Sequence, residues 1–368
     1  MTLGVEEEYL VVDAASGALV PGADRLLPVA RSRLGDAVTS EVNLCQIEVA
    51  TPVCHTLAEV RHYLTLLRHE LTTAAEEAGY RVAAVGTHPL GRWEDQQVDL
   101  SNERYRRMVE DYQIVARQQV ICGCHVHVGI DDPDLAVATM TAARPWLPVL
   151  LALSANSPYW QGLDTGYASY RLQVWQRWPT CGMPPALADR AEFDALVRDL
   201  QAIGAVEDAS YLYWYARPSR TFPTLEFRAG DVCLSVDEAV ALAGLVRALA
   251  WTAAADVQAG RSWRGEPAAT LDAAMWRASR YGLSASLVSP AALARRPAAA
   301  VVAEFLDHVG TGLEVHGDAD ELRDLVAVIV ARGNGAARQR EAFARRHSGQ
   351  DVVDRVLEET APLSRDRG

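Results

Sequence analysis

The chain has 368 residues, of which 49% are hydrophobic and 23% are charged. This composition is that of an ordinary globular protein with a substantial core, and it argues against disorder. Lys plus Arg number 35 and Asp plus Glu number 48, so the formal net charge is −13, which excludes a general affinity for nucleic acid or anionic membrane.

The sequence also restricts the compartment. The N-terminal stretch 1–13 has no basic lead and no long apolar core, and the longest apolar stretch, residues 145–155, is short and contains two prolines. We therefore expect neither secretion nor a membrane span. Six cysteines are too few for a disulfide scaffold, which indicates the reducing cytoplasm. The sequence leaves open whether copies of the chain form a homo-oligomer.

The first third of the chain mixes predicted strands and helices. In chain order we expect a strand, an extended stretch, a helix, a short strand and a polar-faced helix over residues 3–13, 40–53, 57–79, 80–89 and 101–119. Pro52 closes the extended stretch, because proline cannot donate to a strand ladder. The first helix ends at Gly79, a residue suited to a helix C-terminus.

The middle of the chain carries three further predicted strands. The stretch "ICGCHVHVGI", residues 121–130, has the small and β-branched residues of a strand. Pro133 fits the first turn of a helix that runs toward Pro145. The stretches 211–218 and 221–231 are separated by a few turn-forming residues, so they can pair as a hairpin.

The pattern becomes helical after Ser235. Helices are predicted over residues 236–260, 268–282, 297–310 and 320–333. Strands mainly in 1–232 and helices mainly in 233–361 favour an α+β layer over alternating parallel units. The sequence shows no internal repeat, no low-complexity linker and no GxGxxG or Walker-type loop. We therefore expect a single catalytic domain over residues 1–368.

Several predicted strands have one charged face. Side chains alternate along a strand, so His125 and His127 share one face, opposite apolar residues. The same test gives three further pairs: Glu226 with Arg228, Gln46 with Glu48, and Glu6 with Glu8. Glu7 falls on the face opposite its neighbours and makes the last pattern less clean. If these strands lie in one sheet, their charged faces can converge.

Each pair alone also fits a solvated or half-buried strand face, because antiparallel sheets normally carry polar residues on one face. That interpretation explains the combination poorly. Several carboxylates with one neutral imidazole suit Mg²⁺ or Mn²⁺ better than zinc, and Mg²⁺ usually shares its ligand shell with substrate phosphates. Cys122 and Cys124 fall on the face opposite the histidines, so we expect buried thiols rather than zinc ligands.

An ordered set of motifs resembles the carboxylate-amine ligases of the glutamate-cysteine ligase type 2 family. The motifs are "GVEEEY", "EVNLCQIEVATPV", "CGCHVHVG", "YRLQVWQRWPTCGMPP", "RPSRTFPTLEFRAGDVC", "WRASRYGL" and "ARGNGAARQR", running from Gly4 to about Arg340. The resemblance implies a glutamine synthetase-like fold, in which a curved antiparallel sheet forms a saddle backed by helices. It also implies that ATP phosphorylates a carboxylate and that an amine attacks the acyl phosphate, giving an amide, ADP and phosphate.

The resemblance also implies a set of metal ligands. Glu6 and Glu8 match the first pair of ligands, and Glu48 matches a carboxylate on the second strand. Glu41 matches a further acidic ligand, but it has the opposite parity to Glu48 and can share the site only across a bend or bulge. His125 matches the single imidazole ligand.

The remaining matches concern the nucleotide and the catalytic group. His127 is a neighbour of the metal site, nearer the nucleotide. Glu226 matches the last metal carboxylate, and Arg228 matches the cation that contacts the transferred phosphoryl group. By the same resemblance, the carboxylate is the γ-carboxylate of glutamate and the amine is cysteine or another amine. We therefore expect Mg²⁺ or Mn²⁺ as cofactor, ATP as co-substrate and small molecules as partners.

Four further residues are candidate contacts for substrate. Arg171, Arg277 and Arg280 can grip a carboxylate or phosphate in bidentate fashion, but each equally fits an arginine on the surface or on a helix face. Tyr215 lies in "WYARP", where many members of the family read Trp-Asp-x-Arg-Pro. If that acid positions the amine, the choice of acceptor differs in this chain.

Two other functions remain open from the sequence. A metal-dependent amidohydrolase also uses HxH on a strand, but it needs further histidine and aspartate ligands and no ATP. The later histidines, His308, His316 and His347, fall in helix-rich or loop sequence. The other alternative is a catalytically silent binding protein of the same fold, although an inactive site would be expected to lose charges that repel one another.

Overall fold

The computed structural model describes residues 1–261 and 265–361. Its centre is a seven-stranded antiparallel sheet in the order β2-β3-β1-β5-β9-β8, with β4 paired to β1 beside this path. The strands are β1 (Leu3–Asp13), β2 (Val38–Ser40), β3 (Gln46–Ala50), β4 (Tyr80–Ala83), β5 (Cys124–Gly129), β8 (Ala216–Pro218) and β9 (Thr224–Phe227). Two hairpins stand apart from it: β6 (Tyr159–Trp160) with β7 (Leu163–Asp164), and β10 (Ser286–Ser289) with β11 (Ala294–Pro297).

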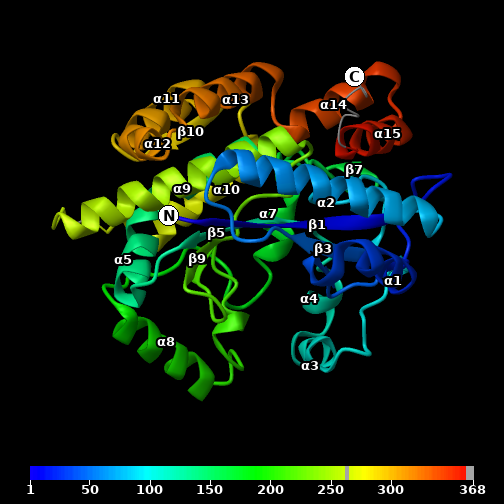
Figure 1. Ribbon diagram of the computed structural model, residues 1–368, viewed down its shortest axis with the longest axis horizontal. Helices are drawn as coiled ribbons and strands as arrows, with labels where there is room; N and C mark the ends of the chain where they lie inside the picture. Colours follow the sequence, from blue (N-terminus) through cyan, green and yellow to red (C-terminus); the bar gives the residue numbers. More distant parts are fainter. Residues whose placement is uncertain (262–264, 362–368) are drawn as a thin grey trace.

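Helices surround this sheet. Those of the first two-thirds are α1 (Ala23–Leu34), α2 (Leu57–Glu77), α3 (Glu103–Tyr112), α4 (Ile114–Arg117), α5 (Pro133–Ala143), α6 (Leu147–Ser154), α7 (Tyr170–Trp175) and α8 (Arg190–Ala202). Those of the last third are α9 (Val236–Gln258), α10 (Ala268–Tyr281), α11 (Ala298–His308), α12 (Gly310–His316), α13 (Ala319–Arg332), α14 (Gly335–Arg346) and α15 (Gly349–Thr360). In Figure 1, α2 and α9 lie along one side of the sheet with α11 to α13 beyond them, and α3 and α8 lie on the other side.

The mixture of helices and an antiparallel sheet is confirmed. The predicted strand 3–13 and helix 57–79 correspond to β1 and α2. The prediction of one extended stretch over 40–53 is wrong, because a turn separates β2 from β3. The single helix predicted over 101–119 is also wrong: it breaks into α3 and α4 at Gln113, which has a left-handed φ of 51°.

Two helical segments, 133–154 and 236–258, are long and apolar enough to cross a membrane by length and composition. In each, 78% of the most apolar window is buried inside the protein, so they serve as core helices. The two prolines were expected to break the apolar stretch, but the helical segment 133–154 continues through them. Pro145 and Pro148 lie in the first turns of successive helical segments, where a missing N–H is tolerated.

The apolar face of the sheet forms the core. Val126 and Val128 of β5 are buried together with Leu225 and Phe227 of β9, and α9 packs beneath β1 and β5. Cys122 and Cys124 are buried free thiols, as the strand parity predicts. Burial raises the pKa of the Cys122 thiol well above its usual range. The opposite face of these strands is left for polar chemistry.

Glu7 is the exception to the apolar face, and it is fully buried. Arg68 of α2 donates from Nε to Glu7 Oε2 at 3.0 Å and from Nη2 to Oε1 at 2.5 Å, and the Tyr9 hydroxyl donates to Oε2 at 2.5 Å. Arg68 also donates to the carbonyls of Cys233 and Leu234 at 2.8 and 3.0 Å. This network ties β1 to α2 and to the segment that precedes α9.

The buried pair gives a prediction for stability. Arg68→Met leaves the Glu7 carboxylate buried without its cation, which costs roughly 3–5 kcal/mol of unfolding free energy in comparable cases. Chemical denaturation measures the change. Arg61→Met is the matched control on the same helix, because its pairs with Asp237 and Glu321 are more exposed and should contribute about 1 kcal/mol or less. Equal losses for the two variants would contradict this account.

Candidate active site

The polar face of the sheet lines a cavity of about 350 Å³, a size typical of small-molecule sites. The strand register determines which side chains meet in it. Glu6 on β1 lies opposite His125 on β5, and Glu8 lies opposite Glu48 on β3. The pairing of β5 with β9 places His127 opposite Glu226.

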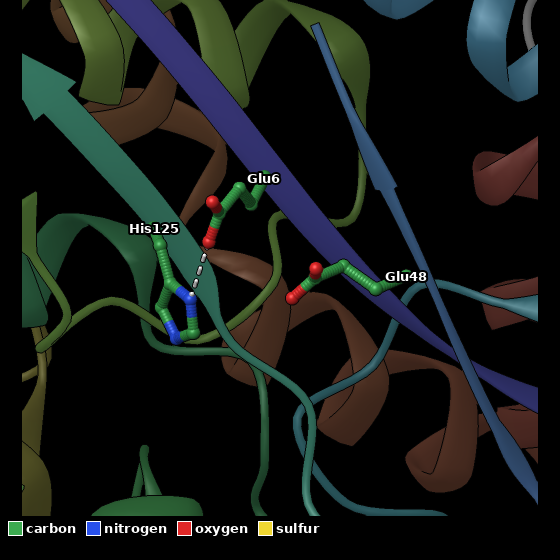
Figure 2. A group of neighbouring side chains, drawn as sticks. All are labelled: Glu6, Glu48 and His125. Carbon is green, nitrogen blue, oxygen red and sulfur yellow. Dashed lines mark hydrogen bonds and ion pairs between the residues drawn. The ribbon is translucent and has the colours of Figure 1, made fainter. Parts of the chain in front are cut away.

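Three of these side chains approach one another closely. Figure 2 shows Glu6, Glu48 and His125 pointing into one space from β1, β3 and β5. Glu6 Oε2 lies 3.2 Å from His125 Nδ1. Each of the three offers one ligand atom within 4.8 Å of the others. Two neighbouring groups meet the same limit: Glu6 with His127 and Glu226, and Glu8 with Glu41 and Glu48.

Glu41 reaches the cavity from outside a strand. It lies in the turn between β2 and β3, so the bend that its parity requires is present. Burial raises its pKa to about 8, and the charge of Glu8 adds to this shift. Burial also raises the pKa of Glu48 well above its usual range, together with the charges of Glu6 and Glu41. The carboxylates therefore crowd one another electrostatically.

The pKa values of the two histidines are shifted in opposite directions. Burial and the nearby Arg228 lower the pKa of His125, which favours the neutral imidazole that binds metals. Burial also opposes protonation of His127, but its contact with Glu6 and the charges of Glu6 and Glu226 together outweigh burial and raise the pKa. His127 Nε2 lies 3.2 Å from Glu6 Oε1, and its Nδ1 lies 2.9 Å from Thr224 Oγ1.

Arginines gather around Glu226. Arg228 pairs with Glu226 Oε1, and Arg217 donates from Nε to Oε2 at 2.9 Å. Burial opposes ionisation of Glu226, but the two guanidinium charges outweigh it and hold the pKa well below its usual range. The ion pair between Arg228 and Glu226 is therefore present in this structure.

Arg217 also lines the cavity, and the alternation of side chains along its strand could have predicted it. It lies opposite Glu226 in the β8–β9 hairpin, so the parity test applied to both hairpin strands finds it. The other lining residues that the sequence did not indicate include five aromatic ones: Tyr105, Trp175, Trp178, Tyr213 and Phe222. The sequence around these aromatic residues does not indicate a cavity, because aromatic residues are also common in hydrophobic cores.

The structure brings Arg171 to the cavity but not the other candidate contacts. Tyr215 is buried behind the wall, where its hydroxyl accepts a 2.6 Å hydrogen bond from Gln176. Arg277 donates to Ser286 and Arg280 to the carbonyl of Gly166, both away from the cavity. Their predicted contacts with substrate therefore have no counterpart in the cavity wall.

The later histidines are also elsewhere. His308 stacks on Trp146, and His316 hydrogen-bonds the carbonyl of Gly312 at 2.7 Å. His347 packs edge-on against Phe343. None of the three lines the cavity, so they do not complete the ligand set that an amidohydrolase needs.

Comparison with solved structures shows where this fold occurs. A bifunctional glutathione synthetase from Pasteurella multocida aligns with a TM-score of 0.71 at 16% identity, over 98% of this chain and 52% of that one, so the chain spans about half its length. A glutamate–cysteine ligase from Francisella tularensis, solved in complex with AMP, aligns with a TM-score of 0.67 at 13% identity, over 99% of this chain and 89% of that one. At these identities the likeness shows the fold alone.

Sequence comparison shows the family. The family model described as glutamate-cysteine ligase family 2 matches residues 2–359. A protein of Saccharopolyspora erythraea named "Putative glutamate--cysteine ligase 2-1" is 43% identical over 364 residues, which cover 98% of this chain and 95% of the relative. The chain therefore belongs to glutamate-cysteine ligase family 2 and is an ATP-dependent carboxylate–amine ligase.

Proposed function

We propose that this ligase joins the γ-carboxylate of glutamate to the amino group of cysteine or another amine, through an acyl phosphate formed from ATP. The observation that carries the proposal is the division of one cavity into an acidic cluster on β1 and β3 and an arginine group beside β9. The name of the Saccharopolyspora relative and the AMP bound to the Francisella enzyme support the choice of substrates.

The chemistry explains why both groups are needed. A carboxylate is a poor acylating agent until one of its oxygens becomes a phosphate leaving group. Forming that phosphate brings two anions together, so positive charge must offset their repulsion in the transition state. Arg228 is proposed to contact the transferred phosphoryl group, and Arg171 to hold an anionic group of the substrate. The protein then contributes orientation and electrostatic stabilisation.

Magnesium or manganese fits the acidic group. Glu6, Glu48 and His125 would hold one ion, and Glu8 with Glu41 extends the same oxygen-rich donor set, which hard cations prefer. When bound, such an ion neutralises phosphate charge and stabilises the transferring phosphoryl group. Glu226 is the weakest candidate ligand, because both of its oxygens already accept from arginines.

Two expectations about architecture belong to the same proposal. The lining residues come from segments between Glu6 and Arg228, and α9 packs beneath the strands that carry them. We therefore treat residues 1–368 as one catalytic domain, and the sheet as a saddle that presents its polar face to the nucleotide. A cytoplasmic location stays a prediction of the cysteine usage.

The first test is the reaction itself. With MgATP, glutamate and a pool of amines that includes cysteine, we expect ADP and phosphate to form only when glutamate is present, with an amide product identified by mass. Hydroxylamine in place of the amine should trap the acyl phosphate as a hydroxamate. Equal ATP turnover without any carboxylate would refute the assignment. Amide hydrolysis without ATP would favour the amidohydrolase, and ATP binding without turnover would favour a silent protein.

The second prediction concerns Glu41 in the metal-free protein. A carboxyl group has a pKa near 4.5 in the unfolded chain, whereas the folded protein raises that of Glu41 to about 8. The folded state therefore holds an extra proton in this range, and stability should fall as pH rises from 4.5 to 8, on the order of a few kcal/mol. Glu41→Gln should flatten this slope and reduce the stabilisation by Mn²⁺.

Denaturation in EDTA, and then with Mn²⁺, at pH 5 to 8.5 measures both effects. Glu110→Gln, which removes an exposed glutamate of α3, is the control. A Glu41→Gln protein with the same pH slope and the same response to Mn²⁺ as the wild type would be inconsistent with the crowded acidic group.

The third prediction concerns Arg228. Arg228→Ala should lower kcat by a factor on the order of a hundred or more while weakening ATP binding less, because a donor aimed at developing charge acts mainly in the transition state. Arg228→Lys keeps the charge but loses the planar fork, so it should also be impaired. Thermal stability should change little, since Arg217 still pairs with Glu226.

Steady-state kinetics and ATP calorimetry separate these effects, with Arg280→Ala outside the cavity as the control. Near-normal turnover of Arg228→Ala, or its failure to fold, would leave the ion pair with Glu226 as the whole role of this arginine.

A further inference from the structure

We propose that Trp175 is a positioning residue, whose indole ring orients Arg171 and Arg228 together in the cavity. The inference rests on the proposed function, in which these two arginines meet anionic groups. Arg171 Cζ lies over the Trp175 ring at 4.5 Å from its centroid, and Arg228 Cζ lies over it at 5.5 Å. One buried ring thus supports two guanidinium groups.

The helix that carries this ring is fixed at its start. Arg171 and Trp175 are four residues apart on α7, so they lie on the same face one turn apart. Ser157 Oγ accepts from the backbone N–H of Arg171 at 3.0 Å, and the Ser169 side chain caps the helix. The buried Asp231 accepts from both serine hydroxyls, at 2.6 and 2.7 Å, and so anchors α7.

Polar contacts hold the two guanidinium groups only in part, since Arg228 pairs with Glu226 through one terminal nitrogen. The Nε atoms of both Arg171 and Arg228 are buried without a hydrogen-bond partner among the residues that the structure describes. The terminal nitrogens of Arg171 approach the carbonyls of Arg228 and Ala229 only at 3.4 Å. The contact of each guanidinium with the Trp175 ring therefore supplies orientation that these bonds do not.

The backbone just before β5, at Gly123, limits Arg171 from another direction. A Cβ atom at Gly123 would lie 2.2 Å from Arg171 Nη2, so only glycine leaves room for the guanidinium there. The N–H of Gly123 donates to Glu8 Oε2 at 2.5 Å, which places the acidic group next to this arginine. The guanidinium of Arg171 thus lies between the Trp175 ring and the backbone of Gly123.

The ring also reduces an electrostatic cost. Arg171 and Arg228 carry like charges and meet at the same indole, where the negative face of the ring attracts each cation. Cation–π attraction is strongest for desolvated cations, and Arg171 is buried. Tyr215 packs edge-on against Trp175 at 6.3 Å. Tyr215 therefore contacts the ring that supports both arginines.

The direct test measures the two arginines without relying on turnover. Phenylglyoxal modifies accessible guanidinium groups, and mass spectrometry gives a rate for each arginine. Trp175→Met should accelerate modification of both Arg171 and Arg228 by about fivefold or more, whereas Trp175→Phe, which keeps a ring, should stay near the wild type. The rate at Arg280, which stacks on Tyr167 and Tyr281, should not change.

Trp178→Met is the matched control. It removes an indole from the same cavity wall, but that indole stacks on Tyr213 at 4.5 Å. Its modification rates at Arg171 and Arg228 should equal those of the wild type. Unchanged rates in Trp175→Met, or equal acceleration in Trp178→Met, would overturn the inference.

Kinetics provide a second readout in the active enzyme. Trp175→Met should lower kcat about tenfold. The double variant with Arg228→Lys should lose little more activity than Arg228→Lys alone, because both changes remove the same contact between the Trp175 ring and the Arg228 guanidinium. Independent, additive losses would overturn the positioning role. If the wild type forms no amide, the proposed function fails, while the modification rates still test the role of Trp175.

A volume-preserving variant covers the case in which Trp175→Met does not fold. Fluorinated tryptophans at position 175 keep the shape of the indole and weaken the negative face of its ring. Modification of Arg171 and Arg228 should then accelerate with each added fluorine. Rates that do not depend on the number of fluorines would show that packing alone holds the arginines.

Discussion

Repulsion among the carboxylates of one cavity is the constraint on which the rest of this structure depends. Glu6, Glu8, Glu41 and Glu48 face the same space, and burial combined with their mutual charge raises the pKa of Glu41 and Glu48. A fold keeps such an arrangement only at a cost in stability, which is typical of functional sites. Cations offset that cost, and the chemistry of phosphoryl transfer needs cations in the same place.

Strand β1 connects this site to the core. Its alternation sends Glu6 and Glu8 to the cavity and Glu7 to the opposite face, where Arg68 and Tyr9 satisfy the buried carboxylate. A shift of one residue in register would exchange the two faces. The buried ion pair with α2 opposes such a shift, because the shift would move Glu7 away from Arg68. The orientation of the two glutamates that face the cavity thus depends on a contact behind the sheet.

Strand parity predicted the polar strand residues of the cavity from sequence, because Glu48, His125, His127 and Glu226 lie on strands whose faces follow the period of two. The position of Glu41 depends on the turn between β2 and β3, which the prediction of one extended stretch over residues 40–53 did not include. Trp175 could not be placed, since it lies on a six-residue helix whose position depends on distant serines. Arg277 and Arg280 were candidates because a guanidinium can grip a carboxylate or phosphate, but both side chains hydrogen-bond locally, away from the cavity.

The central claim is that one cavity holds divalent metal and nucleotide phosphates between the acidic group and the arginines. Crystals grown with Mn²⁺ and a non-hydrolysable ATP analogue test it most directly, because manganese is located by its anomalous scattering. The account predicts a manganese peak within bonding distance of Glu6, Glu48 and His125, with the phosphates between that ion and Arg228. A manganese peak outside this cavity, or phosphates bound away from Arg228, would contradict it.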